Sequence, residues 1–314
     1  MNDLYAGIDL GGTNIKFGLF SSDGSLLEKW MVPTGDRSEE AVFSKIAEEI
    51  TTHLCMSGCD VKNIQGIGMG VPGAVDETGM LLNAPNLGWT MTDCRERLGQ
   101  WLDVPLYAAN DANVAALGEQ AYGTGSDCRS LVFVTLGTGV GGGVIVDGKL
   151  VAGCFGGAGE IGHMVVNLQE TNKCSCGHCG CLEQYVSATG IVRMTKLRLR
   201  GTKLDSVLRA VDNITAKDVF DAVRQEDELA VLVAEDFGRI LGRALALVSA
   251  VTDPEMFVIG GGVSAAGEIL LDYVRRYYRK YAFTPSVNTP IKLAQLGNDA
   301  GIYGAARLAM NSKL

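Results

Sequence analysis

Apolar residues fall along this chain in two alternating patterns. Short apolar runs predict strands over residues 4–10, 64–71, 104–109, 131–136 and 256–259. Apolar positions three or four residues apart predict helices over residues 39–55, 112–122, 184–198, 216–224, 229–251, 265–281 and 299–310. Because strands and helices follow one another through the sequence, the pattern indicates an α/β fold.

One order of strands and turns occurs twice. Residues 5–27 predict a strand, the turn Gly11-Gly12-Thr13, a second strand, an Asp-Gly turn and a third strand. Residues 132–151 repeat this order around Gly137-Thr138-Gly139. We interpret the repeat as a duplicated core with a ligand between its halves, and two unrelated glycine-rich hairpins are the alternative.

Composition narrows the class of protein. A chain of 314 residues is long enough for two domains, and its net charge of -9 argues against a nucleic-acid surface, which needs clustered Lys and Arg. We find no secretory signal and no apolar stretch long enough for a bilayer, since the run 241–251 is short and contains Arg243. The five cysteines outside residues 174–181 fit reduced thiols of a cytoplasmic protein, and disulfides among them are the alternative.

The densest group of reactive side chains lies between Glu160 and Glu183. Cys174, Cys176 and Cys181 have a C-x-C-x4-C spacing, and a histidine precedes Cys174 by eleven residues. This pattern is typical of a tetrahedral zinc site, and a disulfide-linked or redox loop is the alternative. A bound metal would fix the direction of the two glutamates, so that they could hold a ligand with several hydroxyls.

Three glycine turns are candidate nucleotide contacts. Asp9 ends a strand before the turn Gly11-Gly12-Thr13, where backbone N–H groups could bind phosphate and the carboxylate could attract Mg²⁺ through water. The turn 137–139 is the second of this kind, and glycines 260–262 would let a flat adenine ring approach the backbone. None matches the P-loop or the dinucleotide motif, and each alone is also explained as a plain turn.

Together these motifs resemble the actin-like sugar-kinase superfamily, and within it the ROK family of repressors and kinases. The resemblance rests on residues 9–13, 136–141, 258–262, 160–163 and 174–183. Residues 83–89 and 109–113 are similar to the bacterial glucokinase branch of the family.

The resemblance implies a fold and a division into domains. We expect the actin-like ATPase fold, which is ribonuclease H-like, with two α/β domains around a cleft that closes on ligand. Residues 1–112 and 299–314 would form the small domain. Residues 113–298 would form the large domain and carry the zinc loop.

The resemblance also implies the roles of individual residues. Asp111 corresponds to the catalytic base, and its alternative role is a helix N-cap only. The implied sugar contacts are Gly73, Asn86, Asn110, Asp111, Glu160, His163 and Glu183. The implied contacts to ATP and Mg²⁺ are Asp9, Gly11, Gly12, Thr13, Asn14, Lys16, Gly137, Thr138, Gly139, Gly261 and Gly262. The implied zinc ligands are His163, Cys174, Cys176 and Cys181, with His178 and Cys179 as competing candidates.

The expected activity is transfer of a phosphoryl group from ATP to the 6-hydroxyl of glucose, which gives glucose 6-phosphate and ADP. The close alternative is a kinase for N-acetylmannosamine, N-acetylglucosamine, fructose or allose. A sugar-responsive repressor of the same family is disfavoured by the acidic charge and by a first predicted strand that begins at Leu4. A catalytically idle sugar-binding protein is the remaining alternative. Family resemblance further implies a homodimer.

Overall fold

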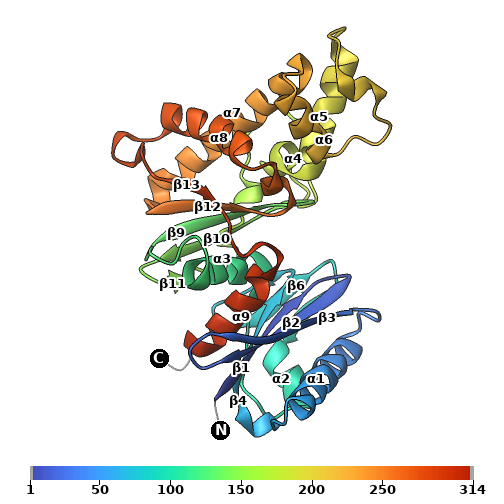
Figure 1. Cartoon of the computed structure of the whole chain (residues 1–314), viewed down its shortest axis with the longest axis vertical. Coiled ribbons are helices and arrows are strands. Elements are labelled where there is room, and N and C mark those ends of the chain that lie inside the picture. Colours follow the sequence, from blue (N-terminus) through green and yellow to red (C-terminus); the bar gives the residue numbers. More distant parts are fainter. Residues whose placement is uncertain (1–2, 312–314) are drawn as a thin grey trace. The chain divides into compact units, whose positions relative to one another are not determined.

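The computed structural model describes residues 3–311 and divides the chain into two compact α/β units (Figure 1). The first unit comprises Met1–Asp127, Gly143–Gly159 and Gln295–Leu314. The second comprises Cys128–Gly142 and Glu160–Ala294. These boundaries differ from the ones we expected, because residues 113–127 and 143–159 belong to the first unit.

A five-stranded sheet forms the centre of the first unit, in the order β3-β2-β1-β4-β8. Its strands are β1 (Leu4–Leu10), β2 (Asn14–Ser21), β3 (Leu26–Pro33), β4 (Ile64–Val71) and β8 (Leu106–Asn110). β4 runs parallel to both β1 and β8, so the carboxyl ends of these three strands share one edge of the sheet. Apolar side chains of the sheet and of α1 (Glu39–Met56) form the main core of this unit.

A small second sheet in the first unit was not expected. It consists of β5 (Ala74–Val75), β6 (Met80–Ala84) and β7 (Trp89–Asp93). Asp93 ends β7 and caps α2 (Cys94–Gly99) by accepting bonds from two backbone N–H groups. The strands are too short for a clear alternation of apolar and polar residues.

Two helices pack tightly beside the first sheet. α3 (Asp111–Tyr122) lies along α9 (Ala300–Asn311), and Figure 1 shows them side by side. A Cβ atom at Gly304 would lie 1.5 Å from the carbonyl oxygen of Val114, so this contact requires glycine. The small residues of α9 therefore allow the two helices to pack closely.

The other five-stranded sheet, called the second sheet below, has the order β11-β10-β9-β12-β13. Its strands are β9 (Leu131–Leu136), β10 (Val140–Val146), β11 (Lys149–Leu150), β12 (Met256–Gly260) and β13 (Ile291–Leu293). Both sheets thus place their five strands in the same sequence, third, second, first, fourth and fifth. The shared order confirms the duplicated core.

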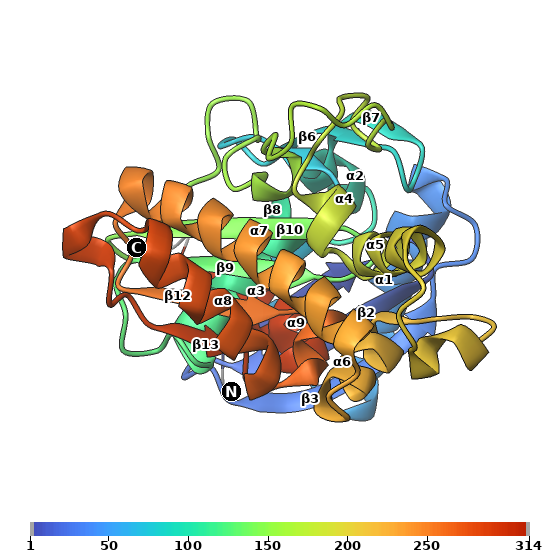
Figure 2. The ribbon, with the colours of Figure 1, turned by 90° about the horizontal axis from the view of Figure 1, so that it is seen from above.

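Helices cover this second sheet. They are α4 (Glu183–Val186), α5 (Ala188–Gly201), α6 (Ala216–Arg224), α7 (Glu228–Thr252) and α8 (Glu268–Tyr281), and Figure 2 shows α7 and α8 lying side by side over β12. The single helix predicted over 184–198 is wrong, because Ser187 has an extended backbone and its hydroxyl caps α5. Short 3₁₀ turns occupy Val61–Asn63, Ile161–His163, Val207–Ala210, Gly262–Ala266, Thr284–Ser286 and Gly297–Asp299.

Within residues 3–311, no helix combines the length and the apolar character that a membrane span requires. All nine cysteines are free in the structure.

Candidate active site and metal centre

Three predicted segments meet at one edge of the first unit's sheet. The register pairs Asp9 on β1 with Gly70 on β4, and Val71 on β4 with Asn110 on β8. Just beyond β4, the carbonyl oxygen of Gly73 accepts a hydrogen bond of 3.1 Å from Asn110 Nδ2. The topology of the sheet therefore brings Asp9, Gly73 and Asn110 to a common edge.

Asn110 and Asp111 have different roles at the start of α3. Asn110 is buried, and its Oδ1 accepts bonds from the backbone N–H groups of Ala112 and Asn113 at 2.9 and 3.2 Å, so it is the helix cap. Asp111 is the first residue of α3 and is exposed. One of its oxygens accepts from the N–H of Ala112 at 2.8 Å. A carboxylate at this position faces the positive end of the helix, which stabilises its anionic form.

Asp9 forms an ion pair within the predicted phosphate turn. Its Oδ2 lies 2.9 Å from Lys16 Nζ on the neighbouring strand, and Lys16 also donates to the carbonyl oxygen of Asn298 at 3.1 Å. The carboxylate approaches the start of α9, since a Cβ at Gly301 would lie 2.8 Å from Asp9 Cγ. A partly buried carboxylate beside a tight glycine turn suits a hydrated Mg²⁺, which prefers oxygen ligands.

The first turn itself is closed by backbone bonds. Gly11 N–H donates to the carbonyl oxygen of Asn14 at 2.9 Å, and Thr34 Oγ1 donates to the carbonyl oxygen of Gly11 at 2.7 Å. Gly12 lies next to Asn86, because a Cβ at Gly12 would be 3.7 Å from the Asn86 carbonyl oxygen. One predicted sugar contact thus lies against the predicted phosphate turn.

The second glycine turn, residues 137–139, is fastened to α4 and α5 in the second unit. Ala188 N–H donates to the carbonyl oxygen of Gly137 at 2.8 Å. Glu183 Oε2 accepts a bond of 3.0 Å from Val140 N–H, and a Cβ at Gly139 would lie 2.2 Å from the same oxygen. The sequence predicted Glu183 only as a sugar contact, and it contains no signal for this bond, which joins residues 43 positions apart.

The predicted zinc ligands form a compact group. One ligand atom from each of His163, Cys174, Cys176 and Cys181 lies within 4.8 Å of all the others. Cys174 Sγ is 3.8 Å from His163 Nδ1, and Cys176 Sγ is 3.6 Å from Cys181 Sγ. Zinc–sulfur bonds of about 2.3 Å in a tetrahedron give ligand separations of roughly 3.8 Å, so the four residues fit this metal.

Two competing ligands lie outside this group. Cys179 Sγ is directed to the carbonyl oxygen of Thr171 at 3.6 Å, and His178 Nδ1 is 3.6 Å from Cys176 Sγ. Burial raises the pKa of Cys176, but hydrogen bonds, first those of His178 and then those of Cys181 and Cys174, together outweigh it and lower that pKa to about 6. Burial raises the pKa of Cys181 to about 12. His178 is therefore a neighbour that favours a thiolate at Cys176.

The two nitrogens of His163 face different groups. Nδ1 is directed to the cysteine cluster, whereas Nε2 lies 4.0 Å from Glu160 Oε2. Glu183 lies on the other side of the cluster, where its Oε1 accepts bonds of 3.0 Å from Ser175 Oγ and 3.5 Å from Cys174 Sγ. A metal at the cluster would fix the tautomer of His163 with its N–H on Nε2.

A cavity of about 350 Å³ adjoins the third glycine cluster in the second unit. It lies between α6 and the turn 262–266, and Phe220 and Val263 supply its apolar wall. Lys217, Asp221 and Arg224 supply polar groups. An apolar slot with a few polar groups suits a flat base. Sequence reasoning identified Gly261 and Gly262 here but missed the contribution of α6.

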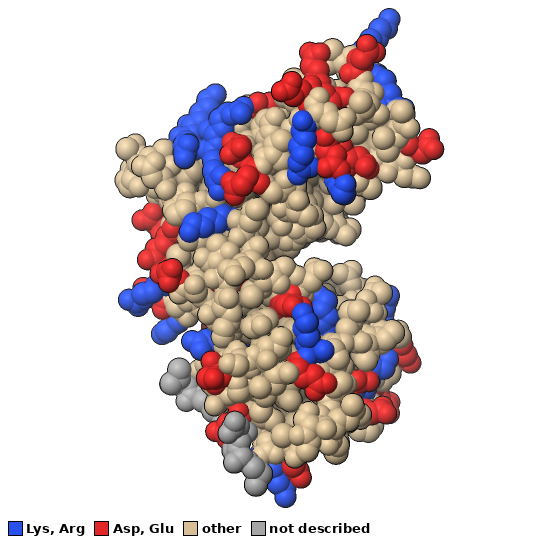
Figure 3. Space-filling view, in the orientation of Figure 1, with Lys and Arg blue, Asp and Glu red and all other residues tan. Residues whose placement is uncertain are grey.

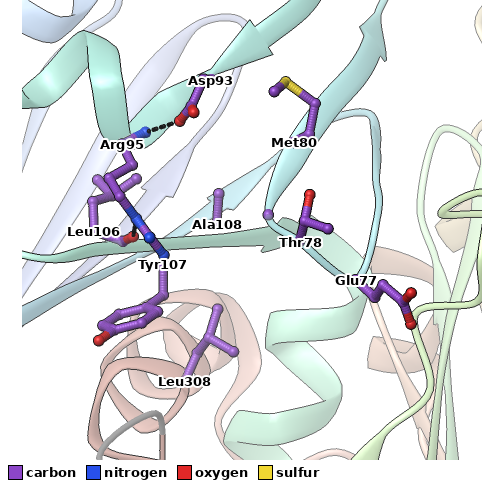
Figure 4. Close-up of a pocket in the computed structure, with 10 residues that line it drawn as sticks. Glu77, Thr78, Met80, Asp93, Arg95, Leu106, Tyr107, Ala108 and Leu308 are labelled. Carbon is purple, nitrogen blue, oxygen red and sulfur yellow. Dashed lines mark hydrogen bonds between the residues drawn. The ribbon is translucent and has the colours of Figure 1, made fainter.

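Another cavity of about 350 Å³ lies in the first unit and includes none of the predicted residues. It is lined by residues from β6, β8 and α9, among them Tyr107 and Leu308 (Figure 4). The Arg95 guanidinium lies 5.6 Å from the centre of the Tyr107 ring and donates to the carbonyl oxygen of Leu106 at 3.3 Å. Because this cavity contains none of the predicted site residues, we assign the candidate site to the sheet edge and the glycine turns.

Charges of both signs intermingle on the face shown in Figure 3, where basic side chains gather over the region of α8. Several of these basic residues have acidic partners. Arg275 Nη1 lies 2.6 Å from Glu268, and Arg276 Nη1 lies 2.5 Å from Glu235. Such pairing reduces the positive potential that phosphate groups of nucleic acid would meet.

The chain as a whole is similar to proteins of known family. The model of the ROK family matches residues 5–312. A glucokinase of Halalkalibacterium halodurans is 37% identical over 311 residues, which is 97% of this chain and 94% of the relative. The crystal structure of a ROK family glucokinase from Streptomyces griseus in complex with glucose and AMPPNP is 35% identical, with a TM-score of 0.78 over 98% of this chain and 99% of that one.

A xylose repressor of Caldicellulosiruptor bescii is also similar, with 30% identity over 98% of this chain and 78% of the repressor. The structural match confirms the expected actin-like α/β fold. The relatives thus include both glucokinases and a xylose repressor.

Proposed function

The chain belongs to the ROK family, and we propose that within it the protein is a glucokinase, which transfers the γ-phosphoryl group of ATP to the 6-hydroxyl of glucose. The products are glucose 6-phosphate and ADP. The observation that carries this proposal is the exposed Asp111 carboxylate at the start of α3, next to the bonded pair Gly73 and Asn110. The similarity to a glucokinase that binds glucose and AMPPNP supports the choice of substrates.

Asp111 is the proposed catalytic base. Phosphoryl transfer depends mainly on positioning and on charge neutralisation, and a base near the attacking hydroxyl accepts its proton as the bond to phosphorus forms. Because Asn110 caps α3, the Asp111 carboxylate is not required for the cap. Gly73, Asn86 and Asn110 are the proposed sugar contacts of the first unit.

The glycine turns are the proposed phosphate contacts. Backbone N–H groups of Gly12 and Thr13 would bind phosphate oxygens, with Gly11, Asn14 and Lys16 beside them. Mg²⁺ bound with ATP would neutralise charge on the phosphates, and Asp9 would hold it through water. In the second unit, the turn 137–139 has the same proposed role.

The cavity beside Gly261 and Gly262 is the proposed adenosine pocket. Its wall at Phe220 and Val263 is apolar, as a purine ring requires. ATP as phosphoryl donor also agrees with a cytoplasmic protein, which we propose as its location.

Zinc is the proposed structural metal of the second unit. His163, Cys174, Cys176 and Cys181 would complete its tetrahedral shell, so the metal has no open position for chemistry. By holding His163, the metal would present the Nε2–H to a sugar hydroxyl, with Glu160 and Glu183 as further proposed sugar contacts.

Two alternatives remain to be tested. A kinase for another hexose or for an N-acetylhexosamine would use the same residues, and a ROK-type repressor would bind the sugar without transfer. We test them by supplying ATP and Mg²⁺ with a panel of hexoses and N-acetylhexosamines, with coupled detection of ADP. Glucose should give the highest kcat/KM, and a higher value with another sugar would replace it as substrate. Light scattering would test the predicted homodimer.

The role of Asp111 has its own test. Asp111→Asn should lower kcat about 10²–10⁴-fold while the dissociation constant for glucose, measured by calorimetry, changes little, because only proton acceptance is lost. Asp103→Asn, which alters an exposed carboxylate outside the site, is the control and should keep wild-type turnover. Turnover of Asp111→Asn within a few-fold of wild type would remove Asp111 from the role of base.

A further inference from the structure

Glu119, near the end of α3, is a fully buried carboxylate to which the proposed reaction gives no role. Both of its oxygens accept hydrogen bonds from the backbone. Oε1 accepts from Leu296 N–H at 2.7 Å, and Oε2 accepts from Thr124 N–H at 2.9 Å and from Gln295 N–H at 3.1 Å. Burying a charge is costly unless such bonds satisfy it. We therefore expect this carboxylate to have a structural role beyond packing.

The three N–H groups belong to two different segments of the first unit. Thr124 lies three residues before Asp127, where the unit's first segment ends and the chain leaves it. Gln295 is the first residue of the unit's last segment, where the chain returns for the last time. One side chain therefore holds the outgoing and the returning segments against the same helix.

Both bonded elements lead to proposed site residues. α3 begins with Asp111, two turns before Glu119. The returning segment continues from Leu296 to Asn298, whose carbonyl oxygen accepts from Lys16, the ion-pair partner of Asp9. It then reaches Gly301, which packs against the Asp9 side chain. Through its helix and its bonds to the returning segment, Glu119 is thus connected to both the proposed base and the proposed magnesium-holding carboxylate.

We propose that Glu119 is a positioning residue, which sets the place of the returning segment 295–301 relative to α3 and thereby the place of Asp9 and Lys16 relative to Asp111. It acts through backbone N–H groups and does not touch substrate. An apolar side chain would fill the same volume, but it would take from the three N–H groups the acceptor that Glu119 gives them. Only the kinetic consequence of this proposal rests on the proposed phosphoryl transfer.

Two variants test this proposal from different positions. Glu119→Gln keeps the size of the side chain but turns an NH2 group toward at least one N–H donor, so one or two of the three bonds are lost. Gly123→Ala leaves Glu119 intact but places a Cβ 2.1 Å from its Oε2, which must move. The φ of Gly123 is −118°, so alanine brings a clash there without backbone strain.

The control is Thr92→Val, which removes another buried hydrogen bond of the first unit, from Thr92 Oγ1 to Glu39 at 2.7 Å, far in sequence from both segments. Thr92→Val should lower the free energy of unfolding by an amount comparable to that of the two test variants, without moving residues 295–301. This variant separates a general loss of stability from a loss of position.

The first measurement is hydrogen exchange, which does not depend on activity. In Glu119→Gln and Gly123→Ala, the amides of Thr124, Gln295 and Leu296 should exchange about tenfold faster than in wild type, as the loss of one charge-assisted bond implies. Thr92→Val should leave them unchanged. Unchanged exchange in a folded Glu119→Gln protein would overturn the proposed attachment.

The second measurement is steady-state kinetics with glucose, ATP and varied Mg²⁺. Both variants should lower kcat about tenfold and raise the Mg²⁺ concentration for half-maximal rate at least threefold, while the glucose dissociation constant stays within threefold. If the two variants exchange faster but keep wild-type kcat and wild-type Mg²⁺ dependence, Glu119 has a structural role only and the positioning role is overturned. If wild type itself does not phosphorylate glucose, the proposed function fails, whereas exchange still decides the attachment.

Discussion

Glu170, which precedes the proposed zinc ligand Cys174 by four residues, anchors its loop to the second unit. Its Oε1 accepts from the backbone N–H groups of Thr171 and Asn172 at 3.1 and 3.0 Å. Its Oε2 accepts from Tyr185 Oη at 2.9 Å and from Arg193 Nη1 at 2.8 Å. The backbone bond from Asn172 is the largest of the influences that lower the pKa of Glu170 to about 2.

A lowered pKa means that folding favours the ionised carboxylate. The stabilisation is fully present above about pH 4.5, the ordinary value for glutamate, and is lost as the pH falls toward 2. A fall of this size corresponds to about 3 kcal/mol in the free energy of unfolding. Because the side chain keeps 10% of its surface exposed, we discount this to roughly 1–2 kcal/mol for solvent screening.

We therefore expect Glu170→Gln to lower the free energy of unfolding of the second unit by roughly 1–2 kcal/mol at pH 7. The difference from wild type should shrink as the pH falls from 4.5 toward 2. Urea unfolding followed by far-UV circular dichroism measures it. Tryptophan fluorescence serves as an internal reference, since Trp30, Trp89 and Trp101 all lie in the first unit.

The control for this experiment is Glu48→Gln, which changes an exposed carboxylate on α1 and should leave both transitions in place. A Glu170→Gln protein with wild-type stability at pH 7 would contradict the reasoning. So would a deficit that stays constant down to pH 2.5, because the loss would then not arise from the ionised carboxylate.

Two further predictions concern the metal cluster and the helix pair. Cys181→Ser should reduce bound zinc, measured by mass spectrometry, from about one per chain to a small fraction, while Cys179→Ser should retain it; equal zinc in both would contradict the ligand set. Gly304→Ala should destabilise the first unit by about 1–3 kcal/mol in urea unfolding, because its Cβ would overlap the Val114 carbonyl. Gly99→Ala, with open space around it, should be neutral or slightly stabilising, and equal losses in the two would refute the packing argument.

Local patterns in the sequence predicted most of the fold. Buried strands such as Leu4–Leu10 are continuous apolar runs, and helices such as α7 repeat apolar residues on one face, so each can be identified from its own residues. The duplication was predictable because the same turn chemistry, glycines and a threonine after a strand, occurs at both 10–13 and 136–139. The four predicted zinc ligands also come together, because three of them are closely spaced in one loop.

Features that depend on contacts between distant residues could not be predicted. The bond from Val140 to Glu183 and the bonds from Gln295 and Leu296 to Glu119 join residues 43 to 177 positions apart, and nothing in the sequence near either glutamate indicates them. The break at Ser187 was missed for a related reason. A serine within a helical pattern is ambiguous until its hydroxyl is seen to cap the following helix.

Glu183 links two features that the sequence presented as separate, the metal cluster and the glycine turn 137–139. One of its oxygens accepts from Val140 beside that turn, and the other accepts from the hydroxyl of Ser175, which lies between two of the proposed zinc ligands in the cysteine loop. A carboxylate shared in this way transmits a displacement of either partner to the other, because neither bond can lengthen without weakening. Zinc in the second unit would therefore hold the proposed phosphate turn in place as well as the proposed sugar contacts, although the metal would touch neither ATP nor the sugar.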